Sequence, residues 1–143
     1  SDDIPLGRFD LVTMNPPYKD PKTGPVNNNA AAAAARFETQ CSLAEICAAA
    51  SRLTNFGGRF CMCSRTERLA DTVCEMRNAG LEPKRLRMVS KNKDSAPWLF
   101  LIEGKKGAKP FLNMMPGLYL YNDDGTESDE LLSVTGIYRG QKK

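Results

Sequence analysis

The sequence predicts an open α/β sheet, mainly parallel with one antiparallel strand, with helices flanking it. Its apolar segments follow the order strand, helix, strand, helix, strand, strand, which is typical of such a sheet. The 143 residues match the size of one domain. Hydrophobic residues (41%) and charged residues (26%) occur in the proportions of soluble globular proteins. No apolar run approaches the roughly 20 residues that span a bilayer, so we expect no membrane partner.

The first strand is expected over residues 9–14, a short apolar run that ends at two consecutive prolines. A helix is then expected from Ala30 to Leu53, because Asn29 can cap it and six alanines open it. Gly57 and Gly58 are expected to end this helix.

The second half of the pattern starts with a strand over residues 59–63 and a helix over residues 67–78 that ends at Gly80. Strands are expected over 81–89 and 98–102, joined by a short loop and therefore antiparallel neighbours. The last of them is apolar throughout, so we expect it to be central, with Trp98 in the core.

Histidine is absent, which excludes Ser-His-Asp and Cys-His nucleophile pairs and the commonest zinc ligand. The five cysteines lie in apolar patterns without C-x-x-C spacing. We therefore expect reduced core thiols in a cytoplasmic protein, and no metal site.

Charge is unevenly distributed along the chain. Residues 59–109 carry twelve Lys or Arg against six Asp or Glu, whereas residues 110–138 carry five acids and no base. A basic middle indicates either an anionic partner such as nucleic acid or a solvated basic face. The candidate phosphate contacts are Lys19, Lys22, Arg65, Arg68, Lys84, Arg85, Arg87, Lys105 and Lys106.

Asn15-Pro16-Pro17-Tyr18 directly follows the first strand, and open α/β sheets bind ligands at the carboxyl ends of their strands. The Asn15 side-chain oxygen and the Pro16 carbonyl can accept both protons of an amino group, while Tyr18 stacks on its ring. Pro17 fixes the turn. Such a clamp aims an amine at an electrophile without a general base. The alternatives are a simple strand-terminating turn and a proline-rich recognition peptide.

The segment from Asp10 to Tyr18 resembles motif IV of the S-adenosylmethionine-dependent amino methyltransferases, which methylate adenine N6, guanine N2 or the glutamine side-chain amide. Segments 57–60, 67–69, 80–87 and 102–107 resemble one branch, the bacterial tRNA1(Val) adenine-37 N6-methyltransferase-like proteins. The resemblance implies a Rossmann-like methyltransferase sheet, S-adenosylmethionine as cofactor, and structured RNA, preferably tRNA, as substrate. It makes Asn15, Pro16, Pro17 and Tyr18 catalytic, and Asn15 also a cofactor contact.

The resemblance also implies what lies outside these residues. The family's Gly-rich cofactor loop precedes motif IV, and this chain has eight residues before Phe9 and no Gly-x-Gly-x-x-Gly. We therefore expect residues 1–143 to be the C-terminal, substrate-side half of a class I methyltransferase domain, inactive alone and prone to self-association through strand 9–14. The alternatives are a protein-glutamine N5 or guanine N2 methyltransferase, or a non-catalytic association module.

Overall fold

A computed structural model describes residue 7, residues 9–16 and residues 42–140. Its centre is a sheet with strand order β1-β2-β4-β3-β5, and β6 pairs with β3 beyond that path. The strands are β1 (Phe9–Met14), β2 (Thr54–Arg65), β3 (Leu81–Ser90), β4 (Leu99–Lys106), β5 (Asn113–Met114) and β6 (Leu118–Tyr119).

The predicted fold class is confirmed. β1 and β2 are parallel, and β5 and β6 are parallel to β3. β4 lies between β2 and β3 and is antiparallel to both, so it is the one reversed strand of the described sheet. Its central place was predicted from its apolar sequence, and Phe100 and Ile102 are buried there.

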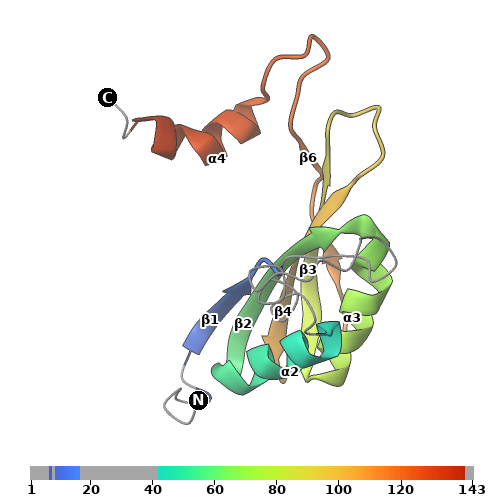
Figure 1. The fold of residues 1–143 in the computed structure, drawn as a ribbon, viewed down its shortest axis with the longest axis vertical. Helices are drawn as coiled ribbons and strands as arrows, with labels where there is room; N and C mark the ends of the chain where they lie inside the picture. Colours follow the sequence, from blue (N-terminus) through green and yellow to red (C-terminus); the bar gives the residue numbers. More distant parts are fainter. Residues whose placement is uncertain (1–6, 8, 17–41, 141–143) are drawn as a thin grey trace, which may run out of the picture.

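Two helices cover one face of the sheet: α2 (Leu43–Leu53) and α3 (Leu69–Asn78), the latter preceded by a 3-10 turn, η1 (Thr66–Arg68). Figure 1 shows both on the same side of the strands. The core lies between them and the sheet, where Phe60, Met76 and Leu81 are fully buried. Burial of these side chains is the main stabilising contribution to this layer. Gly80 has φ +82 and ends the α3 region, as predicted.

The helix predicted from Ala30 to Leu53 ends at Leu53 as expected, but it does not run unbroken from the alanines. Ser42 is extended (φ −66°, ψ 157°), and its side chain accepts a hydrogen bond from the Glu45 amide, so α2 begins after it. This is an N-cap, so α2 begins inside the range of the predicted helix. Residues 29–41 lie outside the described part of the chain.

Gly57 and Gly58 do not end the helix; they lie inside β2. Phe9 pairs with Thr54 but Leu11 pairs with Arg59, so residues 55–58 bulge out of the ladder. Gly57 has φ +81, and a Cβ on Gly58 would lie 2.8 Å from Thr54 Cγ2 and 3.1 Å from the Phe9 carbonyl oxygen. Only glycine fits both positions without strain.

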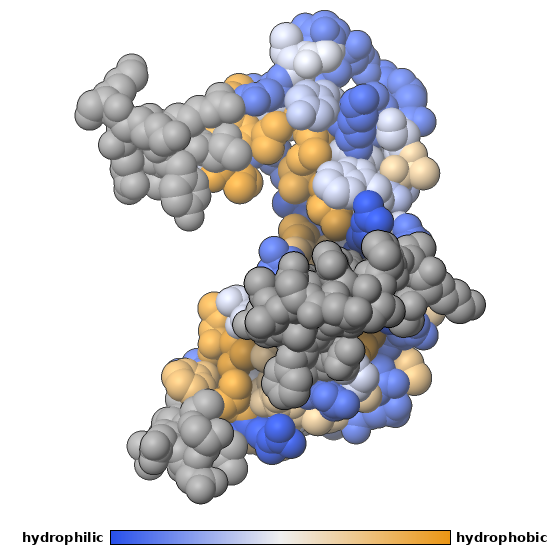
Figure 2. All heavy atoms as spheres, viewed as in Figure 1, coloured by the Kyte–Doolittle hydropathy of each residue, from blue (hydrophilic) through white to orange (hydrophobic). Residues whose placement is uncertain are grey.

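The last helix, α4 (Asp129–Gly140), stands away from α2 and α3 at the end of an extended segment (Figure 1). The Arg87 guanidinium in β3 pairs with the Glu130 carboxylate at its start. Apolar side chains are exposed there and along β1, including Val134 and Leu11 (Figure 2). Among the described helices none is long and apolar enough to cross a membrane.

Candidate functional site

The carboxyl edge of the sheet holds Asn15 and Pro16, the first two residues of the predicted motif. β1, β2 and β3 all run toward this edge, because β2 is parallel to β1, and β2 and β3 are both antiparallel to β4. Asn15 and Pro16 follow the last residue of β1 there. Asn15 is exposed at the end of the strand. Pro17, Tyr18, Lys19 and Lys22 lie outside the described residues.

Asn15 is held by the neighbouring strand. Met14 pairs with Met62, so the next residues, Asn15 and Cys63, lie opposite each other. The Cys63 thiol donates to Asn15 Oδ1 with a sulfur–oxygen distance of 3.1 Å. An amide oxygen has two lone pairs, so this bond leaves one free for a second donor. Sequence reasoning missed Cys63, because only the parallel register places it beside the motif.

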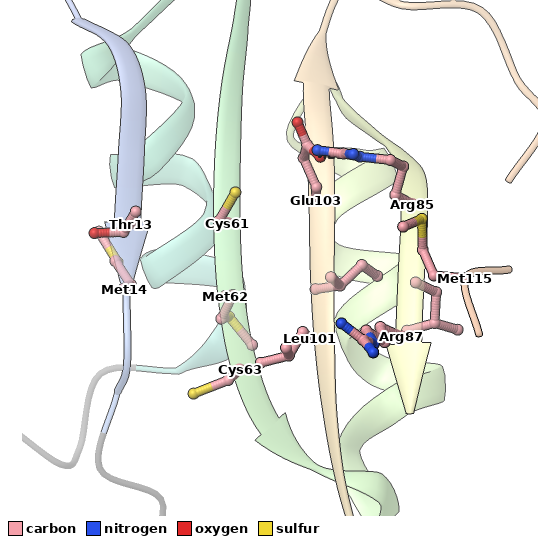
Figure 3. Close-up of a pocket in the computed structure, with 12 residues that line it drawn as sticks. Thr13, Met14, Cys61, Met62, Cys63, Arg85, Arg87, Leu101, Glu103 and Met115 are labelled. Atoms are coloured by element: carbon pink, nitrogen blue, oxygen red, sulfur yellow. Dashed lines mark hydrogen bonds and ion pairs between the residues drawn. The ribbon is translucent and has the colours of Figure 1, made fainter. Parts of the chain in front are cut away.

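The face of the sheet opposite α2 and α3 carries a hollow of about 430 Å³ (Figure 3). Its floor is mostly apolar, and Cys61, Cys63 and Leu101 lie on it. The Glu103 carboxylate is only 12% exposed and pairs with the guanidinium groups of both Arg59 and Arg85. In Figure 3 Arg85 reaches across from β3 to Glu103, and the Cys63 sulfur points toward the β1 side.

The cysteines differ in burial, and burial raises the pKa of two of them. Burial raises the pKa of Cys47 to about 11, with a further contribution from Glu75. Burial also raises the pKa of Cys61, and Glu103 adds to this, while Arg85 and Arg59 oppose it. Cys74 is exposed and Cys61 and Cys63 are half-buried, so the expectation of core thiols holds for Cys47 alone of these four.

The seven predicted phosphate-contacting residues that the structure describes lie in different parts of the sheet. Arg65 ends β2 and Arg68 lies in η1, both at the edge that holds Asn15. Arg85 and Arg87 lie in mid-strand and pair with Glu103 and Glu130. The remaining three, Lys84, Lys105 and Lys106, lie toward the opposite edge.

Two of those lysines donate hydrogen bonds to backbone carbonyl oxygens. Lys106 Nζ donates to the Ser51 and Thr54 carbonyl oxygens at 2.6 and 3.0 Å, at the C-terminus of α2. Lys84 Nζ donates to the carbonyl oxygens of Lys109 and Pro110 at 2.9 and 3.3 Å. Sequence charge alone could not separate these structural lysines from the arginines beside the motif.

Trp98 was expected in the core, and this is wrong: its exposed fraction is 45%. It stands just before β4, at the carboxyl edge of β2, and its carbonyl oxygen accepts from the Thr66 amide at 3.2 Å. The apolar pattern that predicted burial holds from Leu99 onward, inside the strand. Trp98 therefore joins Asn15, Arg65 and Arg68 at one edge.

The fold is similar to that of solved methyltransferases. A predicted O-methyltransferase, protein Atu636 from Agrobacterium tumefaciens, matches with a TM-score of 0.70 at 14% identity, covering 94% of this chain and 54% of that one. TTHA0409, a putative DNA modification methylase from Thermus thermophilus, matches with a TM-score of 0.51 at 16% identity, covering 77% and 51%. Its complex with S-adenosyl-L-methionine gives a TM-score of 0.50 at 18% identity, covering 77% and 52%.

These likenesses define the class of fold: the chain has a mixed α/β sheet similar to the sheets of these structures. It spans about half the length of the solved structures that it matches. No protein-family profile and no curated protein matches the sequence.

Proposed function

We propose that this chain is the substrate-side, C-terminal half of a class I S-adenosylmethionine-dependent methyltransferase that methylates adenine N6 in structured RNA, preferably tRNA. The observation that carries the proposal is the place of Asn15 and Pro16, at the carboxyl edge of β1 in a methyltransferase-like sheet. In this proposal the chain is related to the tRNA1(Val) adenine-37 branch, because segments 57–60, 67–69, 80–87 and 102–107 resemble that branch. The cofactor-binding loop belongs to the other half of the domain in this proposal.

The chain's own groups bind and orient the amine. Asn15 Oδ1 uses one lone pair for the Cys63 thiol and offers the other to an amine proton. The Pro16 carbonyl accepts the second proton, Pro17 fixes the turn and Tyr18 stacks on the base. The target base must leave its stack to reach this clamp.

The neutral acceptors Asn15 and Pro16 fit a site beside a cationic methyl donor, and no histidine is needed there. S-adenosylmethionine supplies an electrophilic methyl group when bound, with Asn15 as the cofactor contact in this chain. The clamp holds the amine nitrogen along the line of attack, which is a catalytic contribution from positioning. Four free thiols in the described residues suit a cytoplasmic enzyme.

The test is methyl transfer from labelled S-adenosylmethionine to tRNA and to a release-factor-like protein, by the protein that contains this chain. We expect labelled tRNA, and a fall in kcat of roughly 100-fold for Asn15→Ala. Asn55→Ala is the matched control, since Asn55 bonds Asp10 at 2.7 Å at the other end of the same strand pair. Label on protein glutamine or guanine N2, or full activity of Asn15→Ala, would contradict the proposal.

A second candidate, an association module, is favoured by one observation. β1 pairs with β2 and is the edge of the described sheet, with Phe9 and Leu11 exposed at 44% and 57%. Such an edge recruits another strand, from a second copy or from the cofactor half. Sedimentation analysis tests this: a mass of one chain at high concentration contradicts self-association.

A further inference from the structure

Trp98 is an exposed aromatic side chain on a fixed backbone. Its amide donates to the Val89 carbonyl oxygen at 3.0 Å, and its carbonyl oxygen accepts from the Thr66 amide at 3.2 Å. The preceding carbonyl, of Pro97, accepts from the Thr66 hydroxyl at 3.4 Å. The indole is thus presented from the junction of β3, β4 and η1. A large aromatic surface of this kind loses little conformational entropy when it binds a flat ligand.

The register places Trp98 relative to Asn15. Asn15 lies beside Cys63 of β2, and Arg65, two residues further along β2, pairs with Leu99, the residue after Trp98. Asn15 and Trp98 therefore belong to strands separated by two inter-strand spacings, which is about 10 Å across the sheet. Both stand at the edge to which β1 and β2 run.

Basic side chains lie at the same edge of the sheet as Trp98. Arg65 is exposed at the end of β2, and Lys91 is exposed at the start of the loop that leads to Trp98. Arg68 lies 4.0 Å from the Asp71 carboxylate in the next turn, and Glu67 is an exposed acid between the two arginines. The loop also holds Lys93, which pairs with Asp123, and the exposed acid Asp94. Segments 65–71 and 91–97 together carry four bases and three acids, an excess of one positive charge, which suits a ligand that joins a flat ring to a negative group.

We propose that Trp98 and Arg65 form a nucleotide-binding subsite for an unpaired nucleotide next to the target base. The indole stacks on the base, and the Arg65 guanidinium contacts a phosphate of the same strand. Stacking on an aromatic side chain and backbone charge contacts are the two terms by which proteins hold single-stranded nucleic acid. The inference rests on the proposed function in one respect, since Asn15 sets where the target base lies.

The experiment uses the 143-residue chain and a short single-stranded oligoadenylate carrying a fluorescein label. Trp98 is the one tryptophan of the sequence, so its intrinsic fluorescence reports on this subsite alone. We expect saturable quenching by the oligonucleotide. Anisotropy titration should give a Kd at least about fivefold higher for Trp98→Ala and within about twofold for Trp98→Phe. Arg65→Gln should weaken binding and reduce the salt slope by about 1.

Arg52→Gln is the matched charge control, because Arg52 is exposed in the last turn of α2, which leads into the start of β2 at the opposite edge of the sheet, and it should leave the Kd unchanged. An oligonucleotide that binds Trp98→Ala as well as the unchanged chain, or binds without quenching, overturns the subsite. Quenching by a release-factor-like peptide in place of RNA also overturns it.

Different results would contradict the proposed function and the nucleotide-binding subsite. If the complete protein transfers no methyl group to RNA while oligoadenylate still quenches Trp98 fluorescence, the proposed function is contradicted and the nucleotide-binding subsite is supported. If Asn15→Ala abolishes methylation while Trp98→Ala changes neither the Kd nor the KM for RNA, the nucleotide-binding subsite is contradicted and the proposed function is supported.

Discussion

The Cys63 thiol donates a hydrogen bond to Asn15 Oδ1 at 3.1 Å, across the parallel pair β1 and β2. The bond links the side chain proposed to hold the amine to a strand that is anchored in the core by Phe60 and Met62. It orients the Asn15 amide, with the oxygen rather than the nitrogen toward β2. The amide is therefore preorganised by its neighbour, which reduces the cost of ordering it when substrate binds.

Removal of the donor should loosen Asn15. Cys63→Val keeps an apolar side chain of similar size but has no S–H group, and we expect altered NMR resonances of the Asn15 side-chain amide and a roughly tenfold lower kcat with little change in KM. Cys63→Ser restores a donor and should recover most of the activity. Cys61→Val, on the same strand face two residues away, is the control. Equal effects of the two valine variants would mean that strand packing, not the hydrogen bond, matters.

Gly58→Ala should destabilise the chain by about 1–3 kcal/mol, because its Cβ would lie 2.8–3.1 Å from Thr54, Asn55 and Phe9 atoms within the bulge. Urea unfolding measures the loss. Gly57→Asn is the comparison: Gly57 has φ +81 with no atom within 4 Å of an added Cβ, and asparagine adopts this strained conformation at a lower cost than other residues with a side chain, so we expect a smaller loss. An equal or larger loss for Gly57→Asn would show that the close contact at Gly58 is not the constraint.

Lys106→Met should lower the free energy of unfolding by about 1–2 kcal/mol. The ammonium caps the carbonyl oxygens of Ser51 and Thr54 at the end of α2, where the helix dipole also favours a positive charge. Thermal unfolding followed by circular dichroism provides the measurement. Lys105→Met, at the exposed neighbouring position, should change stability by less than about 0.5 kcal/mol. If both variants behave alike, the cap contributes nothing.

Alkylation should distinguish the thiols. Cys47 is fully buried and its pKa is about 11, so iodoacetamide near neutral pH should modify exposed Cys74 and leave Cys47 intact. Mass spectrometry of peptides gives the site. Rapid labelling of Cys47 in the native chain would contradict its burial.

The same thiol predicts a pH dependence of stability. Its pKa is about 11 when folded against 9.0 as the ordinary value, so between these values the folded chain holds more protons than the unfolded chain. The stabilising contribution is complete below pH 9 and is lost as pH rises toward 11. Urea titrations should show a steeper loss over this window for the unchanged chain than for Cys47→Ala. Parallel curves for the two chains would exclude the effect.

Local sequence signals predicted most elements and the reversal of one strand. The apolar run that ends at Ile102 predicted the central place of β4, and the short connection from β3 predicted its antiparallel direction. The failures occurred where a local signal competes with tertiary contacts. Ser42 caps α2, which begins at Leu43 inside the predicted helix, and the Gly57-Gly58 pair forms a bulge in β2 although such pairs often end helices.

At the candidate site, local sequence is enough to predict the chemical groups at the end of the first strand: an amide and an exposed carbonyl at Asn15 and Pro16, without histidine. These follow from local chemistry and from the prolines that end a strand. No local segment predicts that Cys63 contacts Asn15, that Arg65 and Trp98 share their edge, or that Lys106 caps a helix. These contacts depend on strand register, because the bulge and the pairing of the whole sheet set which residues of two strands meet.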